Sequence, residues 1–305
     1  MDAQACRIVE ASTPQPAPRR AGRTYYLASR LLPADGRRAV FALYGYARTA
    51  DDAVDEPGDP SVQGARLDAL ESGLRAASAG VSDASSNPDE ADMLAALADA
   101  IRRFGIPPAT FDAFGRSMRM DLPGHPMFRN RYADLAELAD YVYGSAAVIG
   151  LQLVPILGAD PDDDEIAAGA ALLGEAFQLT NFLRDVAEDL ARDRVYLPLD
   201  HLAAFGVDEE NLFADAAAGS TGPRLRRAIA HVVAVNRDQY RRTIPAITAL
   251  PPRTRPAICA AARSYSAILT EIEQRDYEVF GGRAVVPLRR RIGHAVVSMT
   301  GRPQL

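Results

Sequence analysis

Two acidic clusters, far apart in the chain, carry the side chains best suited to metal chemistry. They occupy residues 51–56 and 185–189, and the surrounding sequence predicts a helix at each. In each cluster two aspartates stand four residues apart, Asp51 with Asp55 and Asp185 with Asp189. This spacing puts both carboxylates on one helical face, where like charges repel. We therefore expect a cation to offset the repulsion.

Oxygen ligands without nearby His or Cys suit a hard cation such as Mg²⁺, which binds one or two carboxylates together with substrate phosphates. Asn181 lies four residues before Asp185 and adds an oxygen donor to the same face. Arg48 and Arg184 adjoin the clusters and could hold phosphate oxygens, or form salt bridges with neighbouring aspartates. Either acidic cluster alone would be interpreted as a solvated helix face. Two of them beside apolar residues favour a magnesium–diphosphate site between facing helices.

Departure of diphosphate from an allylic carbon leaves a carbocation, which a dry cavity with aromatic faces can stabilise. Five tyrosines in otherwise apolar helical segments are candidates for this role: Tyr44, Tyr46, Tyr141, Tyr143 and Tyr265. A tyrosine in such a segment is more often part of the core. Spacing alone does not select among them.

Composition limits the function classes. Hydrophobic residues make up 48% of the 305 residues, which suffices for a large core, and the net charge of −6 argues against nucleic-acid binding. Two cysteines provide no disulfide framework. The sequence contains no glycine-rich nucleotide motif, so no nucleotide cofactor is expected. Without a signal peptide or an uninterrupted apolar span, the chain is expected to be cytoplasmic, with any membrane contact peripheral.

Helical periodicity dominates the chain, and strand signals are scarce. The proline-containing residues 1–22 predict a disordered arm, and residues 23–305 predict one all-α domain. After a break at residues 32–35, the expected helices cover residues 35–55, 62–79, 90–104, 109–121, 135–157, 163–192, 223–249, 253–278 and 287–299. Arg289, Arg290 and Arg291 could meet acidic lipid headgroups, although a solvated helix face is the simpler interpretation.

At these motifs the chain resembles the squalene/phytoene synthase family of head-to-head isoprenoid synthases. The segment YGYARTADDAVDE (44–56) looks like the family's first aspartate-rich motif, and QLTNFLRDVAED (178–189) like its second. The second continues into RDRVYLP (192–198) in the family manner. Residues 24–33 resemble the opening helix, and residues 141–150 the central tunnel helix.

The resemblance implies an all-α isoprenoid-synthase bundle with a central hydrophobic tunnel capped by both acidic motifs. It implies metal binding (Mg²⁺, with Mn²⁺ as an alternative) by Asp51, Asp55, Asn181, Asp185 and Asp189. By motif position, the implied diphosphate contacts are Arg48, Arg184, Arg283 and Thr24. The tyrosines near the reacting carbons would be Tyr44, Tyr141 and Tyr265. Gly22 stands where the family often has a serine, which puts that phosphate contact in doubt.

Within the family the sequence is most similar to bacterial phytoene synthases, which implies prenyl diphosphate substrates. The implied reaction joins two geranylgeranyl diphosphates through prephytoene diphosphate to phytoene, without a reductant. We expect no C-terminal membrane anchor, unlike in many squalene synthases, because the last residues given show no long apolar span. The alternatives are a farnesyl diphosphate enzyme that makes presqualene diphosphate, squalene or dehydrosqualene, and a non-catalytic prenyl-lipid carrier. Oligomeric state is not predicted.

Overall fold

The computed structural model describes residues 28–56, 58–81 and 85–303. In these ranges the regular secondary structure is helical, and the sole strand-like pairing is an isolated parallel bridge between Arg131 and Val195. The all-α prediction is therefore confirmed. The predicted arm (1–22) and Thr24 lie outside the described residues.

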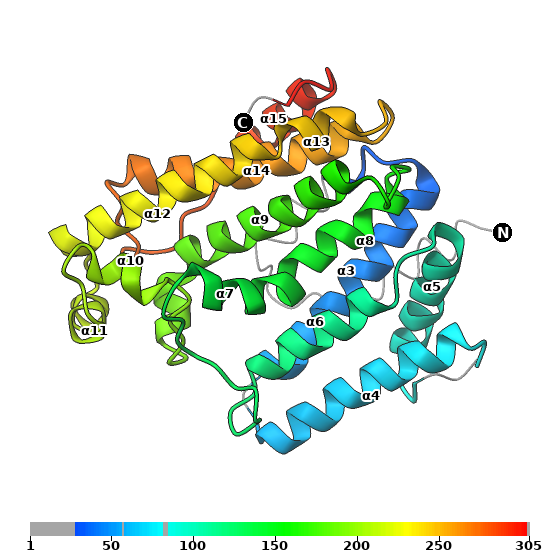
Figure 1. The fold of residues 1–305 in the computed structure, drawn as a ribbon, viewed down its shortest axis with the longest axis horizontal. Coiled ribbons are helices and arrows are strands. Elements are labelled where there is room, and N and C mark those ends of the chain that lie inside the picture. Colours follow the sequence, from blue (N-terminus) through cyan, green and yellow to red (C-terminus); the bar gives the residue numbers. More distant parts are fainter. Residues whose placement is uncertain (1–27, 57, 82–84, 304–305) are drawn as a thin grey trace.

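The long helices lie side by side across the molecule (Figure 1). The first half contains α3 (Ala34–Asp55), α4 (Pro60–Ser78), α5 (Pro88–Phe104), α6 (Ala109–Met120), α7 (Leu135–Val142), the π-helical turn η1 (Tyr143–Ala147) and α8 (Val148–Ile156). The second half contains α9 (Asp164–Leu190), α10 (Leu199–Ala203), α11 (Glu209–Ala218), α12 (Pro223–Arg242), α13 (Ile244–Ala249), α14 (Arg255–Gln274) and α15 (Leu288–Ser298).

Capping chemistry explains where several helices begin and end. Asn87 accepts hydrogen bonds from the first backbone amides of α5, and Gly105 ends that helix with a left-handed φ of 68°. Asp163 caps α9 in the same way. The α3 helix ends at Asp55, two residues before Pro57, which cannot continue a helix. The boundaries predicted for these helices were right to within two residues.

The structure departs from the sequence prediction in three places. The helix expected over residues 135–157 is divided by η1, where Ser117 Oγ donates to the Tyr141 carbonyl at 3.0 Å. The helix expected over residues 223–249 breaks at Thr243, because Pro245 lacks an amide proton to donate. Helices α10 and α11 were missed; they are short and lie in the stretch between two long helices.

The α9 helix packs on η1, α8, α12, α13 and α14, so it occupies the middle of the bundle. Glycine allows its close approach to η1: a Cβ on Gly174 would lie 2.4 Å from the Ala146 carbonyl oxygen.

Two helical stretches, Leu135–Ile156 and Asp164–Leu190, have the length and composition of a membrane span. Both are packed among other helices, with 50% and 39% of their most apolar windows buried. The second acidic cluster, residues 185–189, lies at the C-terminal end of α9, the second of these two stretches.

Candidate active site

The structure brings the two acidic clusters together at one end of the bundle. Arg192 Nη1 and Arg194 Nη1, just past the end of α9, lie 2.5 and 2.8 Å from the two oxygens of Asp55 on α3. These ion pairs join segments about 140 residues apart in sequence. They also place Asp55 close enough to Asp189 for the two charges to interact. The two clusters that the sequence singles out therefore lie close together in the fold.

A second group of charges surrounds Asp185. Arg184 donates two hydrogen bonds to its carboxylate, at 2.8 and 2.6 Å, and Arg283 approaches to 2.7 Å from the segment after α14. Tyr265 on α14 lies near this group and stacks on Phe177, with ring centroids 4.3 Å apart. The structure thus gathers four of the predicted residues on one wall, with an aromatic pair beside the guanidinium groups.

Two predicted metal ligands, Asp51 and Asp189, have no hydrogen bond or ion pair to their carboxylates within the described residues. Desolvation by the packed helices, together with the charges of Asp55, Asp52 and Asp121, raises the pKa of Asp51, although part of the residue is exposed at the surface. Desolvation and the charge of Asp185 raise the pKa of Asp189 to about 8, against the opposing effect of Arg194. Neither carboxylate has a direct counter-ion in the described residues, so a bound cation would stabilise the ionised form of each.

A buried oxygen on α9, Asn181 Oδ1, lies one helical turn before Asp185. Asn181 donates from Nδ2 to Gln178 at 3.2 Å, but its buried Oδ1 has no hydrogen-bond partner among the residues that the structure describes. Such an oxygen is costly unless something binds it. Asp51, Asp189 and Asn181 thus offer the all-oxygen donors that suit Mg²⁺.

The protein side chains alone do not form a closed metal cage. Throughout the part of the chain that the structure describes, no three His, Cys, Asp or Glu side chains converge to hold an ion. An ion that bridges the two clusters would need further oxygens, which diphosphate and water supply in Mg²⁺ sites. The donor set therefore fits a metal ion that binds together with a phosphorylated substrate.

The remaining predicted residues fall into different surroundings. Arg48 pairs with Asp52, at 3.0 and 3.2 Å, rather than with Asp51 or Asp55, and Tyr44 lies beside it. Two other tyrosines considered from the sequence lie elsewhere. Tyr46 is 2% exposed and packs edge-on against Phe111, and Tyr143 is 51% exposed.

The sequence prediction missed a buried acid at the centre of the site, Asp121. It follows α6, is 3% exposed, and accepts hydrogen bonds from Tyr141 (2.7 Å) and Tyr196 (2.8 Å). Arg194 Nη2 donates to the Asp121 backbone carbonyl at 3.3 Å, and its Nε lies 3.9 Å from the carboxylate. Desolvation raises the pKa of Asp121, opposed by Arg194. Asp121 thus fixes the direction of the Tyr141 hydroxyl and links it, through Arg194, to Asp55.

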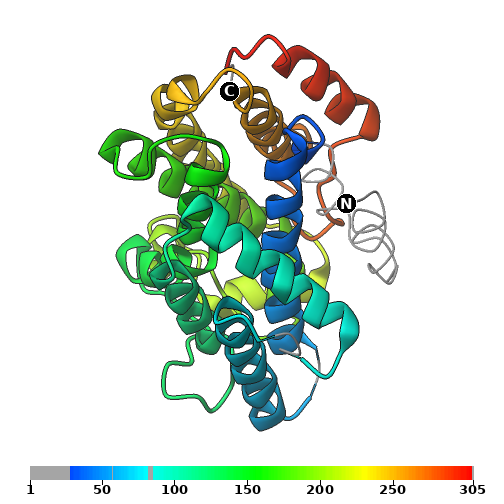
Figure 2. The same ribbon diagram turned by 90° about the vertical axis from the view of Figure 1, so that its right-hand side faces the viewer.

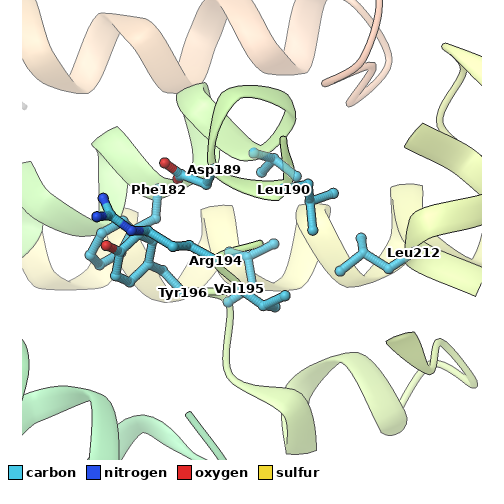
Figure 3. A pocket seen from close by; sticks show the side chains of 9 residues that line it. Phe182, Asp189, Leu190, Arg194, Val195, Tyr196 and Leu212 are labelled. Carbon is cyan, nitrogen blue, oxygen red and sulfur yellow. The ribbon is translucent and has the colours of Figure 1, made fainter. Parts of the chain in front are cut away.

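A small recess lies beside this network, with about 220 Å³ of empty space including its open mouth. Figure 3 shows the Asp189 carboxylate and the Arg194 guanidinium at one end, next to the stacked rings of Phe182 and Tyr196. Leu190 and Leu212 lie toward the other end. The recess therefore sets polar groups of the site against an apolar wall.

Sequence signals for the missed residues exist but are weak. Arg194 and Tyr196 are two apart in an extended segment, which directs both side chains to one side. Asp121 is an acid directly after an amphipathic helix, a position that also suits a solvated helix end. Its burial depends on contacts with residues 20 and 75 positions away, which local spacing does not reveal.

Comparison with known proteins agrees with this geometry. Residues 18–290 match the family model described as squalene/phytoene synthase. The chain belongs to the squalene/phytoene synthase family. It is 34% identical over 275 residues to phytoene synthase 2 of Solanum lycopersicum, covering 88% of this chain and 83% of the relative. It is 36% identical to the phytoene synthase of Arthrospira platensis, covering 88% and 86%. Some plant relatives are longer: the chain spans 63% of the phytoene synthase of an Oncidium hybrid.

Solved structures of the squalene/phytoene synthase family share the fold. A dehydrosqualene synthase in complex with ligand superposes with a TM-score of 0.79 at 25% identity, covering 98% of this chain and 95% of that one. A squalene synthase from Alicyclobacillus acidocaldarius superposes with a TM-score of 0.72 at 26% identity, covering 90% and 94%. The predicted family and its all-α isoprenoid-synthase fold are confirmed.

Proposed function

We propose that this synthase joins two geranylgeranyl diphosphates head to head, through prephytoene diphosphate, to phytoene. The observation that carries the proposal is the identity of 34–36% to phytoene synthases over 88–92% of the chain. The solved squalene and dehydrosqualene synthases are 25–26% identical. We propose a cytoplasmic enzyme that touches membranes peripherally, since its product would be a hydrocarbon.

In the proposed reaction, each ionisation releases one diphosphate, and each carbon–carbon rearrangement ends with the loss of one proton. Two twenty-carbon diphosphates thus give a forty-carbon hydrocarbon, two diphosphates and two protons, with no reductant. Bound Mg²⁺ would neutralise the diphosphate and favour breakage of the allylic carbon–oxygen bond. Asp51, Asp55, Asn181, Asp185 and Asp189 would hold it.

The arginines of the site would bind the substrate phosphates. In the structure Arg48 pairs with Asp52, and Arg184 and Arg283 pair with Asp185. Guanidinium groups bind phosphate and carboxylate in the same fork geometry, so substrate could replace the aspartates as their partner. The exchange would release Asp185 toward the metal. Thr24 is proposed as a further phosphate contact, on family resemblance alone.

The aromatic side chains would protect the cation. Tyr44 and Tyr265 lie by the arginine groups, and their rings can face a positive carbon. Tyr141 would stand near the reacting carbons with its hydroxyl held by Asp121. Burial raises the pKa of Tyr141 well above its usual value, so its hydroxyl stays protonated. The prenyl chains would lie in a hydrophobic tunnel between the helices.

Turnover of geranylgeranyl diphosphate with Mg²⁺ tests the proposal, read as released diphosphate and extracted hydrocarbon. We expect phytoene from the wild-type protein and none from the Asp185→Ala, Asp189→Ala double variant. Glu188→Ala removes an exposed acid from the same helix and should retain activity. Retained turnover in the double variant would contradict the metal assignment. No diphosphate release from the wild type would contradict the function.

A further inference from the structure

The C-terminal helix α15 exposes an unusual amount of apolar surface. Eight large hydrophobic side chains are exposed among the described residues, and five belong to α15 or the residue after it. Their exposed fractions lie between 46% and 67%: Leu288, Ile292, Val296, Val297 and Met299. Isolated exposed hydrophobic residues are common, but a group on one helix marks an interaction surface.

These side chains form a continuous stripe. Leu288, Ile292 and Val296 recur every four residues, which aligns them along one helical face, and Met299 extends the line. A different face packs against α14, where Arg291 is 6% and Ser298 0% exposed. The sequence interpretation of residues 289–291 as a solvated helix face is therefore wrong for Arg291, which is buried. Figure 2 shows α15 at the edge of the molecule, beside α14. The stripe therefore lies on an outer helix, with 46–67% of each of these residues exposed.

The segment that carries the stripe is strongly basic in an acidic protein. Residues 288–305 contain four arginines and no Asp or Glu, whereas the whole chain has a net charge of −6. Arg289 and Arg302 are exposed, and the partly exposed Arg290 pairs with Glu271 at 2.7 Å. Basic residues next to an exposed apolar stripe are typical of helices that lie in the interface of an anionic membrane.

We propose that α15 is the surface by which this protein docks on anionic lipid bilayers, with Leu288, Ile292, Val296 and Met299 inserted among the headgroups and acyl chains. The charge favours lipid over a second copy of the chain, because a symmetric pairing of α15 would bring the same arginines together. This inference locates the membrane contact named under the proposed function, and it requires neither substrate nor turnover.

Flotation of the full-length protein with liposomes tests the proposal. We expect binding to vesicles with 30 mol% phosphatidylglycerol, weak binding to pure phosphatidylcholine vesicles, and weaker binding in 0.5 M salt. Ile292→Glu with Val296→Glu should lower the partition coefficient at least tenfold. Arg289→Gln with Arg302→Gln should lower it about fivefold for each charge removed, and only on anionic vesicles.

Val62→Glu with Val81→Glu is the matched control, because these valines are equally exposed (65% and 53%) but lie far from α15 in the sequence. It should bind as the wild type does, and circular dichroism should show all variants folded. Wild-type protein that stays with the soluble fraction would overturn the proposal, as would a stripe variant that floats like the control. A stripe variant that converts a dimer to a monomer would show that a second copy covers α15. Turnover in detergent micelles reads the proposed function separately.

Discussion

Asp189→Asn should stabilise the metal-free protein while it removes activity. The pKa of Asp189 is raised from 3.8 to about 8, so the folded state holds the proton more tightly than the unfolded chain. The stability associated with this group is complete below about pH 4 and is lost as pH rises through about 8. Asparagine has the same shape and no charge, so the variant does not suffer this loss.

The difference between the pKa of Asp189 in the folded and unfolded states corresponds to about 6 kcal/mol in the free energy of unfolding, once the carboxylate is ionised in both states. The carboxylate keeps part of its solvent exposure, and Arg192 and Arg194 lie near it, so solvent and side-chain movement reduce the effect. We expect the variant to gain about 1–3 kcal/mol at pH 8.5, or about 2–5 °C in Tm for a chain of this size. The gain should shrink toward pH 5.

Differential scanning calorimetry in EDTA, at several pH values from 5 to 8.5, measures this difference. Glu188→Gln is the control, because it removes the same charge from a neighbour that is 59% exposed and should change stability by less than about 0.5 kcal/mol. Added Mg²⁺ with diphosphate should raise the Tm of the wild type more than that of Asp189→Asn. A variant no more stable than wild type at pH 8.5 would refute the electrostatic reasoning.

Three further predictions concern Asp121, Tyr265 and the packing of α9. Asp121→Asn should lower the free energy of unfolding by about 1–3 kcal/mol in urea titrations and lower kcat, because Asn has one acceptor oxygen and leaves one of the two tyrosine hydroxyls without its acceptor; unchanged stability would contradict the network. Tyr265→Phe should change stability by less than about 1 kcal/mol, since its ring still stacks on Phe177, whereas Tyr265→Ala should cost about 3–5 kcal/mol. Gly174→Ala should lower Tm, because its Cβ meets the Ala146 carbonyl, while the same change at the open position Gly293 should leave Tm unchanged or higher.

Much of the fold follows from local sequence chemistry. Capping residues and prolines determine the ends of α3, α5 and α9, and apolar periodicity reveals the long helices between them. The π-helical turn η1 does not follow in this way. It depends on tight packing against α6, where a Cβ on Gly144 would lie 2.1 Å from Ser117 Oγ, and no local signal indicates that contact.

In the candidate site, as in the fold, local features were predictable from the sequence and tertiary contacts were not. The carboxylate pairs were predictable, because four-residue spacing on a helix is a local property that fixes which side chains share a face. The partners of each charge were not. Asp55 pairs with Arg192 and Arg194, and Asp121 receives two tyrosine hydroxyls, through contacts that arise only when distant helices pack. Local sequence thus indicates which carboxylates share a helical face, and tertiary packing decides their ionisation and orientation.

Product analysis after incubation with farnesyl and geranylgeranyl diphosphates together tests the central claim most directly. The protein is supplied with Mg²⁺, with and without NADPH, and hydrocarbons are identified by mass. The account predicts a forty-carbon product that forms without NADPH. A thirty-carbon product, or one that requires NADPH, would contradict the assignment of geranylgeranyl diphosphate as substrate.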